Sequence, residues 1–414
     1  MISDLKKVPH NWQKVKFAEI AEIVNNRIDN PKESGLQDYI GLEHLDTDEI
    51  RIKRYGSTGD VEATKFLCKK GDIIFGKRNS YLRKVAISDR DAVVSAHSMV
   101  LRPKGEKIVS KFLPCFMQSS QFWKTAQAIS EGSMSPTIKW KTLAYQEFWI
   151  PTILDQHRIA NILWALEDSL EKTEKLIEIT ETLKKALSRK LLTKGIGHTK
   201  FKKTELGEIP EEWKIVKMKN IVNSYKNGIY KKSSFYGRGV LNIRMFNIKD
   251  GMINTDDTPL LDINEEELLD YGLTSGDILI NRVNSVELVG KAGILTHEIG
   301  PAVFDSMIIR VRVNQLCIPK FLNYFLNSIL YVRQIEGKIK HAIGQSSLNQ
   351  DDLNNILIGL PTVKEQSKIA SILSKTDETL RQIKDNLDVK SEFKKRLTNE
   401  FLSGRMFDIM RIPQ

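Results

Sequence analysis

The sequence has few of the features that mark a secreted, membrane-spanning or metal-binding protein. Its 414 residues include three cysteines, Cys68, Cys115 and Cys317, which are far apart and form no Cys-x-x-Cys pair. This spacing argues against a disulfide framework and a zinc ribbon, and it favours a reducing cytoplasm. No apolar run approaches the roughly 20 residues that span a bilayer, and residues 1–14 lack the apolar core of a signal peptide. We therefore expect a cytoplasmic protein.

Motifs that hold cofactors or carry out catalysis are also missing. There is no Gly-x-x-x-x-Gly-Lys-Ser/Thr phosphate loop, and Gly237 and Gly239 stand in a basic stretch without the helix of a dinucleotide-binding motif. The Asn/Asp-Pro-Pro-aromatic tetrapeptide of amino-methylating enzymes is absent. The seven histidines form no His-x-x-x-His pair, and we interpret His97 as packed or hydrogen-bonded, not as a base. The sequence thus predicts no catalytic residue, no metal ligand and no cofactor in this chain.

What the sequence does contain is an excess of positive charge on a chain that can fold. Lys and Arg number 63 against 52 Asp and Glu, which gives a formal net charge of +11 and a pI of about 9.2. Hydrophobic residues make up 41% of the chain, enough to form buried cores. The charge favours a polyanionic partner, although a solvated basic surface would give the same pI.

The chain contains the same module twice. Segments of the first half recur in order in the second, at an offset of 201 residues for Val8 and Ile209 that widens to 210 for Pro151 and Pro361. This period is too long for a solenoid and indicates a duplicated module of about 200 residues. A duplication that only thickens a scaffold is the alternative. The matched segments are Val8–Trp12 with Ile209–Trp213, Gly71–Ile74 with Gly276–Leu279, Arg78 with Arg282, Asn79 with Asn284, Ser98–Arg102 with Ser306–Arg310, Lys111–Leu113 with Lys320–Leu322, Ile150–Thr152 with Leu360–Thr362, and Gln156 with Gln366.

The first part of each module, which we call its head, has the pattern of a mixed α/β domain. Short apolar runs such as Gly71–Phe75 and Val93–Val94, bounded by turn residues, predict strands. Lys111–Gln118 and Lys320–Asn327 predict short amphipathic helices.

Each module ends in a long helix. Thr152 with Asp155, and Thr362 with Glu365, form capping-box patterns that predict the helix starts. Apolar residues then recur at alternating steps of four and three, the pattern of a coiled-coil seam. The predicted seam is Ile159, Leu163, Leu166, Leu170, Thr173 and Ile177 in one helix and Ile369, Leu373, Thr376, Leu380, Ile383 and Leu387 in the other, with Leu183, Leu187, Leu191, Phe393, Leu397 and Phe401 extending it less regularly.

Two such stripes cannot both face water. We expect the two helices to pack on each other as an antiparallel coiled coil within one chain, with a head at each end; pairing between chains is the alternative. The predicted fold class is α+β, a duplicated module with two mixed α/β heads joined by the two long helices. The expected domains are the first head (1–150), the first long helix and its link (151–198), the second head (199–360), and the second long helix with a C-terminal tail (361–414).

The remaining polar features are side chains suited to contact DNA. Arg and Lys suit guanine edges and phosphates, and Asn and Gln suit adenine. The loops at Arg78 and Arg282 are the stronger candidates, because each follows a strand-like run at the same place in its module; ordinary solvated surface is the alternative for the others. The candidates are Lys77, Arg78, Asn79, Ser80, Tyr81, Arg83 and Lys84 in the first head, which also has Arg51, Lys53, Arg54 and Tyr55, and Lys231, Lys232, Arg238, Arg282, Asn284, Lys291, Gln345, Ser346 and Asn349 in the second.

These features together resemble the specificity subunits of type I restriction–modification systems. The resemblance covers nearly the whole chain. It rests on Ile209–Trp213, on the strand Gly276–Leu279 and on Leu-Pro-x-x-x-Glu-Gln-x-x-Ile at residues 360–369. The first module departs mildly from the last motif, with Ile150 and Asp155 in place of Leu and Glu.

The resemblance implies a recognition subunit that is not itself an enzyme. Each of two target-recognition domains would read one half of a bipartite double-stranded DNA site, while the helical stalk would set the gap between the halves and dock two modification subunits. Those partners would bring S-adenosylmethionine, and restriction subunits would bring chemistry that depends on ATP and Mg. The competing hypotheses are a coiled-coil interaction scaffold with incidental basic charge, and a nuclease, for which the sequence offers no metal or base cluster.

Overall fold

The computed structural model describes residues 9, 11–285, 288–342 and 345–403, and within them the chain forms two compact units. The first unit contains residues 1–174 and 385–414, and the second contains residues 175–384. Each unit includes one head and one part of each long helix, α5 (Ile153–Lys194) and α10 (Val363–Leu402). The four-part division expected from the sequence stays a prediction, and its ends, residues 1–8 and 404–414, lie outside the described residues.

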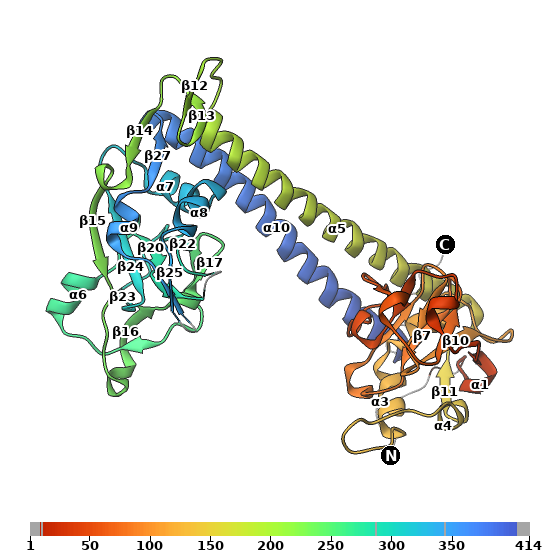
Figure 1. The fold of residues 1–414 in the computed structure, drawn as a ribbon. Coiled ribbons are helices and arrows are strands. Elements are labelled where there is room, and N and C mark those ends of the chain that lie inside the picture. Colours follow the sequence, from red (N-terminus) through yellow and green to blue (C-terminus); the bar gives the residue numbers. More distant parts are fainter. Residues whose placement is uncertain (1–8, 10, 286–287, 343–344, 404–414) are drawn as a thin grey trace, which may run out of the picture. The chain divides into compact units, whose positions relative to one another are not determined.

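The head of the first unit mixes short strands and short helices (Figure 1). Its elements are β1 (Gln13–Lys16), α1 (Phe17–Ile20), β2 (Ala21–Val24), β3 (Arg27–Ile28), β4 (Asp38–Ile40), β5 (Gly56–Ser57), β6 (Lys65–Cys68), β7 (Ile73–Gly76), β8 (Val85–Ile87), β9 (Ala92–Val94), β10 (Ser98–Pro103), α2 (Phe112–Met117), α3 (Ser120–Ala128), α4 (Trp140–Ala144) and β11 (Glu147–Ile150). A four-stranded sheet, β2-β10-β7-β8, lies between a five-stranded sheet, β3-β6-β9-β4-β5, and the helices. Ile73 and Phe75 face the helices and Ile74 faces the other sheet, so β7 is apolar without interruption because both faces are covered.

The head of the second unit repeats this plan with more strands. Its elements are β12 (Phe201–Thr204), β13 (Gly207–Pro210), β14 (Lys214–Lys217), β15 (Val222–Asn227), β16 (Tyr236–Ile243), β17 (Ile248–Lys249), β18 (Met252–Ile253), β19 (Leu260–Leu261), α6 (Glu265–Tyr271), β20 (Ile278–Asn281), β21 (Val283–Asn284), β22 (Ala292–Ile294), β23 (Ala302–Phe304), β24 (Ile308–Val313), α7 (Pro319–Leu326), α8 (Ile329–Glu336), β25 (Lys340–Ala342), β26 (Gln345–Ser347), α9 (Gln350–Asn354) and β27 (Leu357–Leu360). The central sheet has the order β15-β24-β20-β22-β18-β17. Ile278 and Ile280 of β20 join the cluster under the helices, and Leu279 joins the cluster on the other face.

The predicted strands at Gly71–Phe75 and Val93–Val94 are β7 and β9, and the predicted short helices are α2 and α7. The prediction that α2 is amphipathic is wrong, because all six of its residues are buried. This helix shares one core cluster with the sheet and with residues of α5 and α10, so it has no face left for water. Among the described residues, no helix is long and apolar enough to cross a membrane.

An ion pair inside each head corrects one of the repeat matches. Arg102 forms a bidentate pair with Asp72, at 2.6 and 2.9 Å, and Arg312 forms the same pair with Asp277, at 2.6 and 2.9 Å. The strand pairing agrees that Arg102 and Arg312 are equivalent. The sequence match of Arg102 to Arg310 is therefore wrong by two residues. The match aligned the Ser-Met pair that both modules contain, although the connection before β24 is longer in the second module.

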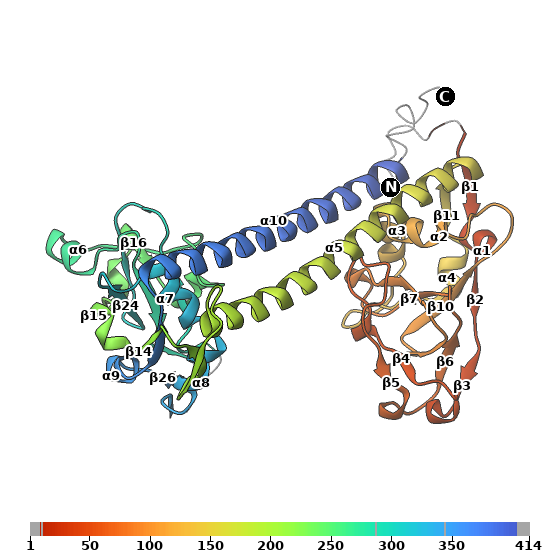
Figure 2. The ribbon, with the colours of Figure 1, turned by 90° about the horizontal axis from the view of Figure 1, so that it is seen from above.

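The two long helices pack side by side and antiparallel within each unit (Figures 1 and 2). In the first unit Glu167 pairs with Lys394, and Lys390 donates to the Thr173 hydroxyl at 2.9 Å. In the second unit Lys184 pairs with Asp377 at 2.6 Å and Lys384 pairs with Glu181 at 2.7 Å. In both units, successive contacts between the helices involve higher residue numbers in α5 and lower residue numbers in α10, so the two helices run antiparallel.

The seam residues occupy two environments. Ile159, Leu163, Ile369 and Leu373 are buried in the same clusters as head residues, so the stripe continues into the head cores. The middle of the seam is buried at Leu170, Thr173 and Leu380 and half-buried at Leu166, Ile177, Thr376, Ile383 and Leu387. Two of the less regular positions do not belong to it: Leu183 is 57% exposed and Phe393 is 49% exposed.

The helix starts differ in how they use their acidic residue. At the first, the Asp155 N–H donates to the Thr152 hydroxyl oxygen at 3.3 Å, and that hydroxyl donates to the Asp155 carboxylate at 2.7 Å. At the second, the Glu365 N–H donates to the Thr362 hydroxyl oxygen, also at 3.3 Å. The Glu365 carboxylate does not close a capping box; it accepts from a backbone N–H of the link before β12 and from the His198 and Trp213 rings. It thereby ties this link to the start of α10.

In the first unit an arginine of the head fills the junction with α5. Arg51 pairs with Asp168 and, at 3.1 Å, with Glu171. Its guanidinium lies over the Trp164 ring, 5.6 Å from the ring centroid. The junction is therefore closed by a cation held between two carboxylates and an indole.

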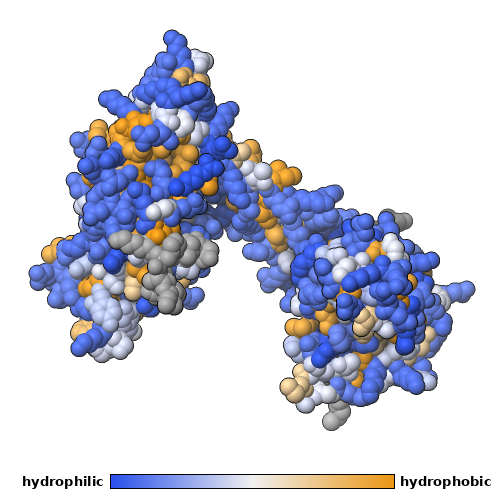
Figure 3. Space-filling view, in the orientation of Figure 1, coloured by the Kyte–Doolittle hydropathy of each residue, from blue (hydrophilic) through white to orange (hydrophobic). Residues whose placement is uncertain are grey.

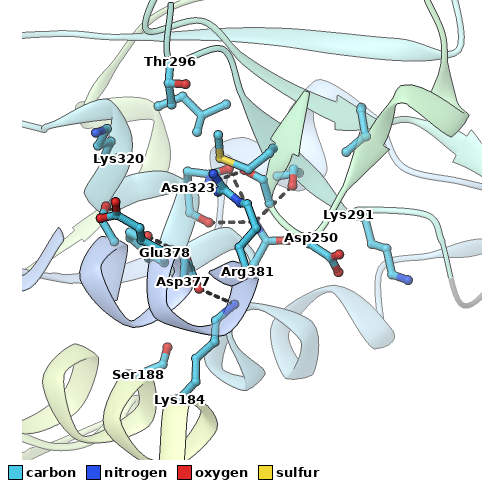
Figure 4. A pocket seen from close by; sticks show the side chains of 18 residues that line it. Lys184, Ser188, Asp250, Lys291, Thr296, Lys320, Asn323, Asp377, Glu378 and Arg381 are labelled. Carbon is cyan, nitrogen blue, oxygen red and sulfur yellow. Dashed lines mark hydrogen bonds and ion pairs between the residues drawn. The ribbon is translucent and has the colours of Figure 1, made fainter. Parts of the chain in front are cut away.

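In the second unit the equivalent junction is open. Met252 pairs with β22 as Arg51 pairs with β8, so methionine stands where the first unit has arginine. On α10, Ser374 stands in place of the tryptophan and Arg381 in place of the second carboxylate. A cavity of about 460 Å³ results, with Lys320 and Lys291 on opposite sides of it in the close-up (Figure 4).

Candidate nucleic-acid interface

The chain that leaves β7 is held between two other segments of the first head. The Lys77 N–H donates to the His97 carbonyl at 3.2 Å, and the Ile138 N–H donates to the Lys77 carbonyl at 2.9 Å. Arg78 then pairs with Thr137 in an antiparallel bridge. Residues 77 and 78 therefore have a fixed backbone, and their side chains start from a rigid base.

The second head repeats this arrangement one residue out of step with the sequence match. The Arg282 N–H donates to the Met307 carbonyl at 2.8 Å, and its own carbonyl accepts from the residue after β26 at 2.9 Å. Val283 pairs with β26. Arg282 is thus equivalent to Lys77 and Val283 to Arg78, so the prediction that Arg78 and Arg282 occupy the same place is wrong by one residue. Residue identity suggested the match, whereas the backbone hydrogen bonds set the register.

A cluster of cations forms around these residues in the first head. The pKa of Lys77 is lowered by burial and by the charge of Arg27, and the pKa of His97 is lowered by burial and by the charges of Arg78, Lys77 and Lys65. Within the described residues none of the four Arg and Lys side chains forms an ion pair. We call Arg27, Lys65, Lys77 and Arg78, which surround the His97 ring, the first-head cation cluster. It creates a positive potential suited to a polyanion.

An aromatic ring lies inside this cluster. The Arg27 guanidinium is 5.9 Å and the Lys77 ammonium 6.0 Å from the centroid of the Phe66 ring. The three side chains line a hollow of about 290 Å³ together with residues of β2, β10 and the segment before α4. Cations held over an aromatic ring beside a hollow present both charge and apolar surface to a ligand.

The candidate residues in the turn after Arg78 differ in their exposure to solvent. Ser80 is 2% exposed, which removes its hydroxyl from any surface contact and corrects its place among the candidates. Tyr81 is 60% exposed and available. Asn79 is half-buried and adopts the left-handed backbone region, with φ +57°.

Several other cations of the first head are held by neighbouring residues. Arg83 pairs with Asp48 at 2.9 Å, and Lys84 donates to the Leu42 carbonyl at 2.7 Å. These bonds hold the loops of the head in place, so we assign both side chains a structural role in preference to DNA contact.

The three cations at residues 51, 53 and 54 also form ion pairs within the first unit. Arg51 closes the junction with α5, Lys53 pairs with Glu174 at 2.6 Å, and Arg54 forms a bidentate pair with Asp46. These ion pairs give all three side chains a role within the first unit, so we rank them below the first-head cation cluster as candidates for DNA contact. A basic run in the sequence does not reveal where its carboxylate partners lie.

Two of the five cationic candidates of the second head are neutralised by carboxylates. Lys231 pairs with Glu267 at 2.6 Å, and two guanidinium N–H groups of Arg238 donate to one carboxylate oxygen of Asp262, at 2.9 and 2.7 Å. The Asn349 side chain caps α9. The remaining candidates are Arg282, which donates to the Ser306 carbonyl at 3.3 Å; Asn284, which accepts from the Ser285 N–H at 2.8 Å; the exposed Lys232 and Lys291; and Gln345 and Ser346 in β26, whose side chains lie outside the described residues.

Sequence reasoning missed Arg27 and Lys65. Each is a single cation within a short strand, with no local motif, and β3 pairs with β6 in the folded head, where Arg27 lies near Lys77 and Lys65 lies near His97. The cysteines offer no contrary site: all three are buried, and burial raises the pKa of Cys68 to about 11. Within the described residues no group of three or more His, Cys, Asp or Glu could hold a metal ion.

Comparison with known proteins connects this geometry to a family. Residues 9–181 and 210–389 match the type I restriction modification DNA specificity domain, so the match occurs once in each module. The chain belongs to this family. The specificity subunit of the type I restriction enzyme MjaVIII from Methanocaldococcus jannaschii is 26% identical over 412 residues, covering 97% of this chain and 94% of that protein.

Two solved structures share the fold of this type I specificity family member. The S subunit of a type I restriction–modification system from M. genitalium has a TM-score of 0.58 at 18% identity, covering 96% of this chain and 98% of the other. A chain from a structure on complex assembly and conformational transition of a type I R-M system has a TM-score of 0.58 at 16% identity, covering 96% and 99%. The fold class expected from the sequence is confirmed.

Proposed function

We propose that this chain is the DNA-specificity subunit of a type I restriction–modification complex, in which each head reads one half of a bipartite double-stranded DNA site. The observation that carries the proposal is the pair of family matches, one per module. Two linked readers of different sequence suit a site with two different halves.

The electrostatics of the first head support contact with DNA. Its cation cluster gathers Arg and Lys side chains that form no ion pair with the described part of the chain, which suits phosphates and guanine edges. In the second head Arg282 occupies the place of Lys77 and is our candidate for the equivalent contact. The two heads thus offer different side chains at one position, as two different half-sites require.

The outer surface of the helices supports docking of modification subunits. Leu176, Ile179 and Leu183 of α5 are 48%, 65% and 57% exposed, and their spacing places them on one helix face. Figure 3 shows apolar side chains exposed along this helix. An apolar stripe on the solvent side of a helix suits a partner helix.

In this proposal the chemistry belongs to the partners. Modification subunits bring S-adenosylmethionine and methylate DNA, and restriction subunits bring the chemistry that needs ATP and Mg. This chain contributes recognition and the stalk that sets the gap between the half-sites. The pure chain is expected neither to methylate nor to cut DNA, and methyl transfer by it alone would contradict this role.

The proposal is tested by co-expressing the chain with its modification subunit and sequencing the methylome. A bipartite methylated site that appears only when this chain is present supports the proposal. A gel shift with duplex DNA carrying that site, against a scrambled duplex across a salt series, separates specific binding from simple charge attraction. Assembly with the partners but no specific shift and no new methylated site would leave the coiled-coil scaffold as the function.

A further inference from the structure

Two exposed apolar side chains stand beside the first-head cation cluster. Met134 is 95% exposed and Tyr81 is 60% exposed. The segments that carry them are joined by a hydrogen bond from the Asn79 N–H to the Pro136 carbonyl, at 2.8 Å. Each of the two side chains lies two residues from that bond. Apolar groups gathered at a charged surface call for a ligand with apolar parts.

The loop that carries Met134 is rigidly built. Glu131 and Thr137 exchange backbone hydrogen bonds at 3.0 and 2.8 Å, which closes the loop at its base. Lys139 pairs with Glu131 at 2.6 Å, and an Arg78 guanidinium nitrogen lies 3.3 Å from the Ser135 hydroxyl oxygen. The loop therefore presents Met134 from a fixed base that Arg78 itself helps to hold.

The turn that carries Tyr81 is strained. The short helical turn Ser80–Leu82 lies between Asn79 and Arg83, two non-glycine residues in the left-handed region, with φ +57° and +49°. Left-handed non-glycine residues persist only where surrounding contacts enforce them, and such strain concentrates at ligand sites. Here Arg83 is fixed by its ion pair with Asp48. The strained turn holds the Tyr81 side chain out into solvent.

We infer that Met134 is a wedge that enters the base stack of the DNA bound by the first head, with Tyr81 packing against the opened step. This inference rests on the proposed function. Proteins that distort DNA insert apolar side chains, methionine among them, between base steps while cations hold the phosphates on either side. The long thioether side chain fits a narrow gap, and an aromatic ring stacks on an exposed base face. The neighbouring cations form no ion pair with any described residue, which favours DNA over a protein partner as the occupant.

The experiment places 2-aminopurine at successive positions of the first half-site, identified from the methylome. The full chain is assembled with its modification subunits, and S-adenosylmethionine is omitted so that no reaction follows. We expect the fluorescence of one probe position to rise on binding, because 2-aminopurine brightens when it is unstacked. At protein concentrations that saturate the DNA, Met134→Ala should lose most of that rise and Met134→Leu should retain it. Tyr81→Ala should reduce the rise, and Leu269→Ala, at a residue of the second head that is 88% exposed, is the matched control and should change nothing.

The outcomes separate the wedge from the proposed function. Specific binding with no probe responding, or with a response that survives in Met134→Ala, overturns the wedge and leaves the specificity role standing. Absence of specific binding by the wild-type assembly overturns both. If Met134→Ala leaves DNA binding and fluorescence unchanged but weakens assembly with the modification subunits, measured by native mass spectrometry, the residue docks a protein and the wedge is wrong.

Discussion

Gln156 and Gln366 lie 210 residues apart and make the same three hydrogen bonds, each inside its own unit. In both, the side-chain oxygen accepts a backbone N–H at 2.8 Å, and the amide donates to two backbone carbonyls at 2.9 and 3.0 Å. Both side chains are fully buried. Through these hydrogen bonds, each glutamine connects the first turn of a long helix to the end of the strand before it (β11 or β27) and to the loop before α2 or α7. The duplication has thus preserved the attachment of head to helix in atomic detail.

Gln156→Ala and Gln366→Ala should each destabilise one unit. Each change leaves one backbone N–H and two backbone carbonyls without the glutamine, at about 1–3 kcal/mol for each group that water cannot reach. Hydrogen–deuterium exchange should rise around α2 in the first variant and around α7 in the second. Gln382→Ala, at an exposed position of α10, is the control. Equal protection in Gln156→Ala and in wild type would show that these bonds contribute little.

Arg78→Ala and Arg282→Ala should each impair the reading of one half-site. A lost bidentate contact to guanine costs about 1–3 kcal/mol and relaxes specificity at that position. Methylation of a library randomised in one half-site at a time would locate the loss. Arg54→Ala, whose arginine is held by Asp46, should behave as wild type. Equal weakening on specific and random DNA would instead assign the arginine to phosphate contact.

Leu380→Glu should destabilise the pair of long helices. Leu380 is 9% exposed, so the substitution buries a carboxylate without a partner and should cost about 2–5 kcal/mol. Thermal melting of the purified chain measures the loss. Leu183→Glu is matched in chemistry but falls on a residue that is 57% exposed, so it should leave melting nearly unchanged while weakening binding of the modification subunit. Similar melting of the two variants would contradict the assignment of the seam.

The pairing of Lys231 with Glu267 should appear as a pH dependence of stability. The hydrogen bond from Lys231 and the Asn264 N–H hold the pKa of Glu267 below its ordinary value of 4.5. A depressed carboxyl pKa stabilises the fold above the ordinary value, and this contribution is lost as the pH falls through the lower folded value. The melting difference between wild type and Glu267→Gln should therefore be full near neutral pH and shrink below pH 4.5. A difference that stays constant across this range would show that the carboxylate charge does not matter.

Lengthening both long helices equally at facing positions should change the gap of the DNA site and leave its halves unchanged. Four added residues extend a helix by about 6 Å and turn it by about 40°, and two base pairs advance about 6.8 Å and turn about 70°. We expect a gap one or two base pairs longer. Seven added residues extend a helix by about 10 Å with almost no turn, whereas three base pairs turn about 100°, so binding should be worse. Methylation of a library that varies only the gap measures this, and an unchanged preference would show that the stalk does not set the gap.

The sequence predicted the large features because they depend on periodic patterns. The seam steps gave two helices that begin within two residues of Pro151 and Pro361, and the recurring strand Gly276–Leu279 identified the module. Apolar periodicity reports burial directly, so these elements could be found without an alignment.

The binding surface was harder to predict because charge alone does not say which cations are free. Lys231 and Arg238 read as DNA ligands in the sequence, yet Glu267 and Asp262 neutralise them across 36 and 24 residues. Arg27 looked unremarkable and lies in the cation cluster. Partner carboxylates are chosen by strand pairing over long distances, and no local pattern encodes that choice.

The contrast between the closed and open junctions limits how freely the heads can be exchanged. A chimera that places the second head on the first helix segment would set Met252 against Asp168 and Glu171, and both carboxylates and the Trp164 ring would lose their contact with Arg51. The reverse graft would bring Arg51 toward the guanidinium of Arg381 across the cavity. Recombination that creates a new DNA specificity would therefore succeed most readily when the crossover lies within the long helix, so that a head travels with the turns that face it. In this family member the segment that must be exchanged intact therefore includes the head and the turns of the long helix that face it.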